Sequence, residues 1–202
     1  MTTGFAFDFD GTVSTEELLP KLARELGIAE EMATLTKATM AGLLDFKQSF
    51  KLRCRLLDNV PISRVREILS SIPMCPEVAD FIRERRNRCV IITGNLECWV
   101  GEAVQKALGC KLISSRAETA NDRIGKLTYI VEKGPSLDEW RTEMNFDRVV
   151  AVGEGANDVE MLRRADIAIA FGGVHAPSLG ALEAANYVVY QGEALCRLMA
   201  PL

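Results

Sequence analysis

The amino-acid sequence predicts an α/β fold in which a doubly wound parallel sheet forms the core and carries a small inserted helical cap. Short, continuously apolar segments alternate along most of the chain with segments that place apolar residues every three or four positions. Continuously apolar strands are typical of parallel sheets that helices cover on both faces. Four consecutive helical segments interrupt this alternation after the first strand, and this interruption predicts the cap.

The first strand is expected at residues 4–9, which are apolar and rich in aromatic side chains. The helical block begins directly after this strand. Helices are expected there at residues 16–26, 30–43, 46–57 and 63–71. We therefore assign residues 13–74 to the cap, and residues 1–12 together with 75–202 to the core.

The remaining core elements follow in alternation. Helices are expected at residues 78–86, 96–108, 137–144, 158–164 and about 179–185. Strands are expected at residues 89–94, 111–114, 148–153, 167–171 and 187–190. Residues 115–131 hold Asn121, Asp122 and Gly125 between β-prone ends, so a hairpin is expected there.

The composition excludes several classes of partner. The chain has 202 residues, of which 48% are hydrophobic and 26% charged, with a net charge of −4 and no basic run. Nucleic acid is therefore not an expected partner. The first residues lack the pattern of a signal peptide and no apolar stretch is long enough to span a bilayer, so a cytoplasmic location without membrane attachment is expected. Six scattered cysteines without a CxxC pair are expected to be reduced.

Two carboxylates lie at the end of the first predicted strand, Asp8 and Asp10 in the stretch DFDGTV. Ligands of doubly wound sheets bind beyond the carboxyl ends of the strands. In an extended chain the two side chains would share a face, and two like charges so close call for a cation or a proton. Oxygen ligands favour Mg²⁺. A solvated turn or a helix N-cap is the alternative interpretation.

Three further strand ends carry polar residues. Thr93 and Gly94 could bind an anion or simply cap a helix. Lys133 alone would be interpreted as a surface charge. Glu154 and Asp158 are four residues apart in a glycine-rich turn, which could bring both to one ion or form an ordinary acidic helix start.

This order of an Asp pair, a Thr, a Lys and an acidic pair resembles the haloacid dehalogenase superfamily of phosphohydrolases, which has a Rossmann-like core. The resemblance implies a phosphatase in which Asp8 forms an aspartyl-phosphate and Asp10 is the acid–base group. It implies Mg²⁺ as the cofactor, held by Asp8, the backbone carbonyl of Asp10, Glu154 and Asp158, the last directly or through water. It implies phosphate contacts from Phe9, Asp10, Thr93, Gly94, Lys133 and Asn157, with Thr93 and Lys133 also stabilising the transition state.

Within this superfamily, the segment 40–53 and its surroundings resemble the phosphoserine phosphatases. That resemblance implies that Glu17 contacts a substrate amino group and that Arg53 grips a substrate carboxylate. It implies that Met40 and Phe46 are apolar lid residues. A solvated helix face and a surface arginine are the alternatives for Glu17 and Arg53.

L-Phosphoserine is thus the expected substrate. Another small phosphorylated metabolite, phosphoryl transfer to an alcohol, or a non-catalytic ligand-binding role are the alternatives. Two residues depart from the family pattern. Glu154 stands where an Asp is usual, which moves the carboxylate by about 1.5 Å and could alter metal affinity. Asn95 replaces a usual glycine and could narrow the pocket or add a hydrogen bond. His175 is expected to be a loop residue.

Overall fold

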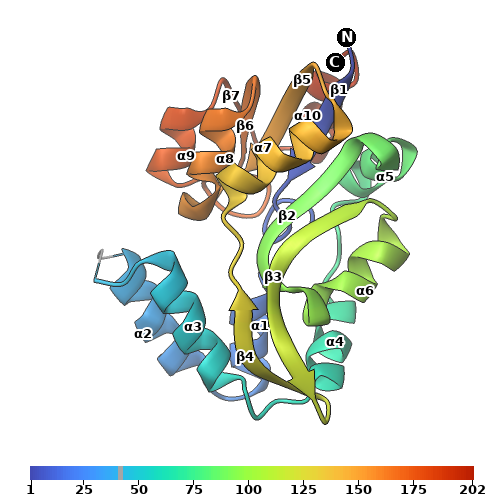
Figure 1. Ribbon diagram of the computed structural model, residues 1–202. Helices are drawn as coiled ribbons and strands as arrows, with labels where there is room; N and C mark the ends of the chain where they lie inside the picture. The colour runs from blue at the N-terminus through green and yellow to red at the C-terminus, as the bar shows by residue number, and fades with distance from the viewer. Residues whose placement is uncertain (41–42) are drawn as a thin grey trace.

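The computed structural model describes residues 1–40 and 43–202, with the side chain of Met40 also outside the described part (Figure 1). The strands of the described residues form one sheet in the order β4-β3-β2-β1-β5-β6-β7. All neighbours pair in parallel except β3 and β4. The strands are β1 (Thr3–Phe7), β2 (Cys89–Leu96), β3 (Lys111–Ala120), β4 (Arg123–Tyr129), β5 (Arg148–Gly153), β6 (Ile167–Phe171) and β7 (Tyr187–Val189). The predicted doubly wound α/β fold is confirmed.

Helices follow the strands in the alternation that the sequence predicts. The α-helices are α1 (Leu18–Glu25), α2 (Ala29–Met40), α3 (Phe46–Leu56), α4 (Ile62–Ser70), α5 (Pro76–Glu84), α6 (Glu97–Ala107), α7 (Lys133–Met144), α8 (Val159–Arg164), α9 (Leu179–Ala184) and α10 (Gly192–Met199). Two short 3-10 turns are η1 (Arg86–Arg88) and η2 (Ala156–Asp158).

The sheet separates two apolar cores, because successive side chains of a strand point to opposite faces. On β1, Phe5 and Phe7 pack into one core, where buried side chains of α5, α6 and α10 cover the sheet. Ala6 packs into the other core, with Leu137 and Trp140 of α7 and buried side chains of α8 and α9. Both faces of the central strands are therefore buried, which explains their continuously apolar sequences.

The register of the central strands brings their carboxyl ends together. Phe7, the last residue of β1, pairs with Ile91 of β2 on one side and with Val152 of β5 on the other. The residues that follow each of these positions therefore emerge at the same edge of the sheet. This edge is where the polar residues of the sequence motifs are expected.

Helices α1 to α4 lie in sequence between β1 and α5. Figure 1 shows them, together with the β3–β4 hairpin, at the end of the molecule remote from both chain termini. The entering and leaving segments lie side by side, since the N–H of Thr15 donates to the carbonyl of Pro73 and the N–H of Cys75 donates to that of Val13, both at 2.9 Å. This geometry suits an insertion that leaves the sheet and returns to it at one point.

Several element boundaries differ from the sequence prediction, and three of the differences have a structural reason. Strand β1 ends at Phe7, two residues before its predicted end. The hairpin expected at residues 115–131 is confirmed, and strand β3 continues through it to Ala120 because its polar second half pairs with β4. Helix α7 begins at Lys133, and Pro135 lies in its first turn, where the missing N–H costs nothing.

Helix α10 was not predicted at all. It is short and follows an edge strand, and it buries Leu195 and Met199 against the core that contains β1. No helix within the described ranges is long and apolar enough to cross a membrane. All six cysteines, each in the described part of the chain, are free.

Candidate active site

A cavity of about 200 Å³ opens at the carboxyl edge of the sheet. The core contributes residues from the loops after β1, β5 and β6 and from the irregular end of β2. Helix α3 and the segment around the start of α1 close the other side. The lining residues are Asp8, Asp10, Glu17, Leu19, Phe46, Phe50, Thr93, Gly94, Asn95, Glu154, Gly155, Asn157 and His175.

Three buried carboxylates converge at the base of this site. Asp8, Glu154 and Asp158 are at most 6% exposed, and one oxygen of each lies within 4.8 Å of the others. Burial and then the charge of Asp158 raise the pKa of Asp8 to about 8, against an ordinary value near 3.8. Burial and then the charge of Asp8 raise the pKa of Glu154 to about 9. The cluster therefore resists carrying its full negative charge without a cation.

Lys133 supplies part of the missing positive charge. It is 5% exposed, and its Nζ donates hydrogen bonds to Oδ1 of Asp8 and Oδ1 of Asp158. Burial lowers the pKa of Lys133, but Asp158 and Asp8 outweigh burial and the net pKa is raised. One lysine cannot neutralise three carboxylates. The remaining negative charge and the all-oxygen donor set fit a hard divalent cation such as Mg²⁺.

The loop after β5 is organised by Asp158 itself. Its Oδ2 accepts the N–H groups of Glu154 at 2.9 Å and Gly155 at 2.8 Å, while Oδ1 faces Lys133. A Cβ on Gly153 would lie 2.6 Å from Asp158 Cγ, so only glycine permits this approach. One oxygen of Asp158 thus shapes the loop and the other faces the charged cluster.

Asp10 lies beside the cluster rather than in it. Its Oδ1 accepts the N–H of Leu18 at 3.0 Å and its Oδ2 accepts Nδ2 of Asn95 at 2.5 Å. Burial raises the pKa of Asp10 to about 6 although both hydrogen bonds lower it. The expectation of an extended chain through Asp10 is wrong, since the backbone turns after β1. The turn still brings Asp8 and Asp10 to one cavity.

Aromatic rings from the cap form the apolar wall. Phe46 and Phe50 of α3 stack with ring centroids 5.9 Å apart and an interplanar angle of 11°. A Cβ on Gly94 would lie 2.8 Å from Phe46 Cζ, so the glycine allows the ring to contact the end of β2. Thr93 is buried there, and its Oγ1 accepts the N–H of Asn95 at 3.2 Å.

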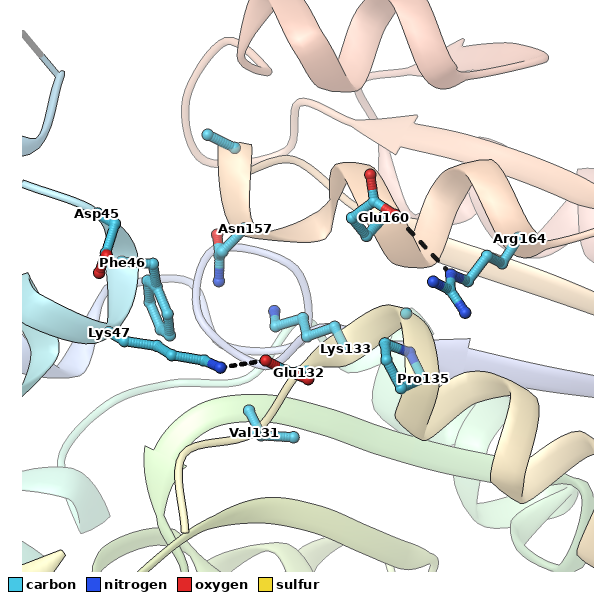
Figure 2. Close-up of a pocket in the computed structure, with 12 residues that line it drawn as sticks. Asp45, Phe46, Lys47, Val131, Glu132, Lys133, Pro135, Asn157, Glu160 and Arg164 are labelled. Carbon is cyan, nitrogen blue, oxygen red and sulfur yellow. Dashed lines mark hydrogen bonds and ion pairs between the residues drawn. The ribbon is translucent and has the colours of Figure 1, made fainter. Parts of the chain in front are cut away.

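A larger cavity of about 510 Å³ adjoins the site between the cap and the start of α7. Figure 2 shows Lys47 of α3 reaching Glu132, close to Lys133 and Asn157. Lys47 and Glu132 form an ion pair that joins the cap to the core. Phe46 and Asn157 line both cavities, so they stand at the boundary between them.

The residues expected to recognise substrate differ in whether they line the smaller cavity. Glu17 lines the smaller cavity. Arg53 does not line it in the described structure, because its Nη2 donates to Thr36 Oγ1 at 2.9 Å and its Nε to Ser49 Oγ at 3.3 Å. The expected lid position of Met40 lies outside the described side chains. Phe9 buries its ring in the core, so only its backbone faces the loop.

Sequence reasoning missed two polar residues of this site. Thr12 Oγ1 donates to Glu154 Oε2 at 2.7 Å. His175 lines the cavity and lies in the loop after β6. A signal for His175 was present, because β6 is parallel to its neighbours and its carboxyl end meets the same edge of the sheet.

Known proteins resemble this chain over most of its length. The family model of haloacid dehalogenase-like hydrolases matches residues 5–163. The phosphoserine phosphatase of Methanocaldococcus jannaschii is 32% identical over 175 residues, which cover 82% of this chain and 83% of that protein. The range that the family model matches contains the buried carboxylates and the lysine.

Two solved structures resemble the whole chain. A phosphoserine phosphatase with an analogue of the phospho-aspartyl intermediate gives a TM-score of 0.82 at 27% identity and covers 98% of both chains. A substrate-bound phosphoserine phosphatase complex gives a TM-score of 0.82 at 27% identity and covers 98% of this chain and 97% of that one. The similarity therefore extends over the sheet and the helices inserted after β1.

Proposed function

The chain belongs to the haloacid dehalogenase-like hydrolase family, and on this premise we propose that it is a Mg²⁺-dependent phosphatase that hydrolyses L-phosphoserine through Asp8. The observation that carries the proposal is the buried set of Asp8, Glu154, Asp158 and Lys133, with Asp10 beside it. Burying several charged side chains together is unfavourable for stability, and such clusters are typical of catalytic and ligand-binding sites.

The nucleophile in this proposal is a carboxylate oxygen of Asp8. It forms a bond to phosphorus while the bond from phosphorus to the ester oxygen breaks, giving an aspartyl-phosphate. Mg²⁺ would be held by Asp8, Glu154, Asp158 and the backbone carbonyl of Asp10. Its positive charge would reduce the repulsion between the anionic nucleophile and the anionic phosphate. Lys133, already bonded to Asp8, adds a second positive charge at the same place.

Proton transfer is the role of Asp10. It gives its proton to the departing ester oxygen and later takes one from the water that attacks the aspartyl-phosphate. Its pKa of about 6 allows both states near neutral pH. The hydrogen bonds from Leu18 and Asn95 fix the orientation of its carboxyl group. Thr93, the Gly94 backbone and Asn157 border the phosphate position and provide donors to its oxygens.

The substrate assignment rests on the cap and on the relatives. Glu17 offers a carboxylate to an ammonium group at the cavity wall. Arg53 can bind a substrate carboxylate through its guanidinium group if its hydrogen bond to Thr36 is replaced by one to the substrate. A cavity of about 200 Å³ suits a small phosphorylated metabolite. The Methanocaldococcus jannaschii relative bears the name phosphoserine phosphatase.

A second candidate is phosphatase or phosphotransferase action on another small phosphorylated metabolite. Two observations favour it: Arg53 is hydrogen-bonded to Thr36 and does not line the cavity, and the adjoining cavity of about 510 Å³ could admit a larger leaving group or an acceptor alcohol. A non-catalytic binding role is less well supported, since Glu154 joins the carboxylate cluster despite its extra methylene.

The test measures phosphate release from L-phosphoserine and from a panel of small phosphate esters, with Mg²⁺ and with chelator. We expect Mg²⁺-dependent turnover with the highest kcat/KM for L-phosphoserine, and none from Asp8→Asn. Preference for another ester would support the second candidate, and transfer to added alcohols would identify a phosphotransferase. No release from any ester would contradict an enzymatic role.

Arg53→Ala separates the substrate candidates further. We expect it to raise KM for L-phosphoserine by about tenfold or more, because a charged hydrogen-bonded contact is lost. KM for an aryl phosphate should stay nearly unchanged. Equal effects on both esters would show that Arg53 does not recognise the substrate carboxylate.

A further inference from the structure

His175 lies in a loop that is anchored at both ends. The N–H of Gly172 donates to the carbonyl of Val189 at 2.8 Å, and the N–H of Ser178 donates to the carbonyl of Glu154 at 2.8 Å. The second bond ties the loop to the backbone of a residue of the carboxylate cluster. The position of His175 is therefore coupled to the base of the site.

The imidazole of His175 reaches across the cavity to the cap side. Its Nε2 lies 2.9 Å from Oε1 of Glu17, whereas Oε1 of Glu154 is 4.0 Å away. An ionised carboxylate can only accept a hydrogen bond, so Nε2 carries the hydrogen and donates it to Glu17. A Cβ on Gly11 would lie 3.2 Å from Nε2, so the glycine leaves the room that the ring occupies.

Glu17 is not held by its own helix. It is the N-cap residue of α1, but its side chain makes no capping hydrogen bond. The N–H of Leu18 instead donates to Oδ1 of Asp10. The side chain of Glu17 is 44% exposed, so without a partner it would sample several rotamers. The bond from His175 supplies such a partner and leaves the second carboxylate oxygen for a ligand.

We infer that His175 is a positioning residue that holds the Glu17 carboxylate for the amino group of the substrate, an inference that rests on the proposed hydrolysis of an amino-acid phosphate. Preorganisation lowers the cost of ordering a flexible side chain on binding. The effect belongs to substrate binding, because the contact is made to Glu17 and not to the reacting carboxylates. A substrate without an amino group gains nothing from it.

The test compares two esters that differ only in the amino group, L-phosphoserine and the phosphate ester of 3-hydroxypropanoate. His175→Ala should raise KM for L-phosphoserine about three- to tenfold with kcat nearly unchanged, as expected for one lost hydrogen bond. KM for the amine-free ester should not change. His175→Gln, which keeps an N–H donor at similar reach, should restore part of the lost affinity. Val174→Ala, on the same loop, is the control and should leave both KM values unchanged.

A double-variant cycle identifies the route of the effect. In a Glu17→Gln background, His175→Ala should cause little further rise in KM, because the two residues act through one contact. The inference would be overturned if the two substitutions raised KM independently, so that their effects multiplied, or if His175→Ala raised KM equally for both esters. Neither result would contradict the hydrolysis of L-phosphoserine. If wild-type protein hydrolyses other esters but not L-phosphoserine, the proposed substrate fails instead.

Discussion

At Glu154 the chain carries a carboxylate one methylene longer than the Asp expected there from the resemblance to the family. Two neighbouring residues accommodate it. Thr12 donates its hydroxyl to Oε2 at 2.7 Å, and a Cβ on Gly11 would lie only 3.3 Å from Oε1. Gly11 also has a φ of +73°, which favours glycine. The hydrogen bond from Thr12 and the space beside Gly11 therefore fix the position of the longer side chain within the cluster.

Thr12→Val should weaken Mg²⁺ activation. The substitution keeps the shape of the side chain and removes the hydrogen bond that orients Glu154, and loss of such a supporting bond typically costs about tenfold or more in metal affinity. The measurement is the Mg²⁺ concentration for half-maximal phosphate release. Thr142→Val, on the exposed surface of α7, is the matched control. An unchanged Mg²⁺ requirement in Thr12→Val would show that Glu154 needs no such support.

At the scale of elements, the turn of the β3–β4 hairpin caps a helix of the inserted segment. Helix α4 begins after Pro61, which provides no side-chain cap. The carbonyl of Asp122 accepts the N–H of Ile62 at 2.7 Å, and its Oδ1 accepts the N–H of Ser63 at 3.0 Å. Two segments far apart in sequence are thereby joined through the free N–H groups of a helix start.

Asp122→Gly should lower Tm by about 2–4 °C, as expected for the loss of a helix cap in a chain of this size. Glycine accepts the φ of +60° at this position, so backbone strain does not contribute. Asn121→Gly, with a φ of +51° in the same turn, is the matched control and should not lower Tm. The measurement is the Tm of both variants by thermal unfolding. Equal Tm values for Asp122→Gly and Asn121→Gly would contradict the capping role.

The sequence predicts the elements whose patterns are strong and misses those that depend on partners. Apolar runs such as residues 148–153 and 167–171 coincide with β5 and β6, because burial on both faces leaves a local pattern. The turn residues Asn121 and Asp122 predict the β3–β4 hairpin, but the polar second half of β3 contains no apolar run that would mark how far the strand extends. Helix α10 is short and buries only two residues, so its sequence contains too few apolar positions to predict a helix without the core that it packs against.

The same distinction applies to the site. Asp8, Glu154 and Asp158 follow strand ends and Thr93 lies in the irregular last part of β2. The parallel topology brings them together with Lys133. The local contacts were beyond the reach of sequence patterns. A hydrogen bond from Asn95 is one of the two effects expected from the sequence, but the pattern does not identify Asp10 as its partner. The rotamer of Arg53 depends on Thr36 and Ser49 of the folded cap.

At the scale of the whole molecule, the carboxylate cluster links stability to pH and to metal. Asp8 and Glu154 have folded-state pKa values raised to about 8 and about 9, from ordinary values of 3.8 and 4.5. Between these limits the folded protein binds more protons than the unfolded chain. Without metal, both groups therefore make the protein less stable as pH rises from about 4 to 9.

Mg²⁺ should reverse this loss by binding the ionised carboxylates. At a fixed Mg²⁺ concentration of about 100 times its Kd at pH 8, we expect a rise in Tm of roughly 5–10 °C at that pH. The rise at pH 6 should be smaller, because more protons must be displaced at the lower pH. Thermal unfolding at both pH values checks this, with NaCl of equal ionic strength as the control. A shift independent of pH, or one that NaCl reproduces, would place Mg²⁺ elsewhere.

Phosphorylation of Asp8 during turnover is the central step of the proposed mechanism. The measurement is an acid quench during hydrolysis of L-phosphoserine, borohydride reduction, and mass spectrometry of the peptide that carries residue 8. An aspartyl-phosphate is reduced to homoserine, so we expect homoserine at position 8 only when substrate is present, and none in Asp8→Asn. A phosphorylated residue elsewhere, or phosphate release that persists in Asp8→Asn, would contradict this mechanism.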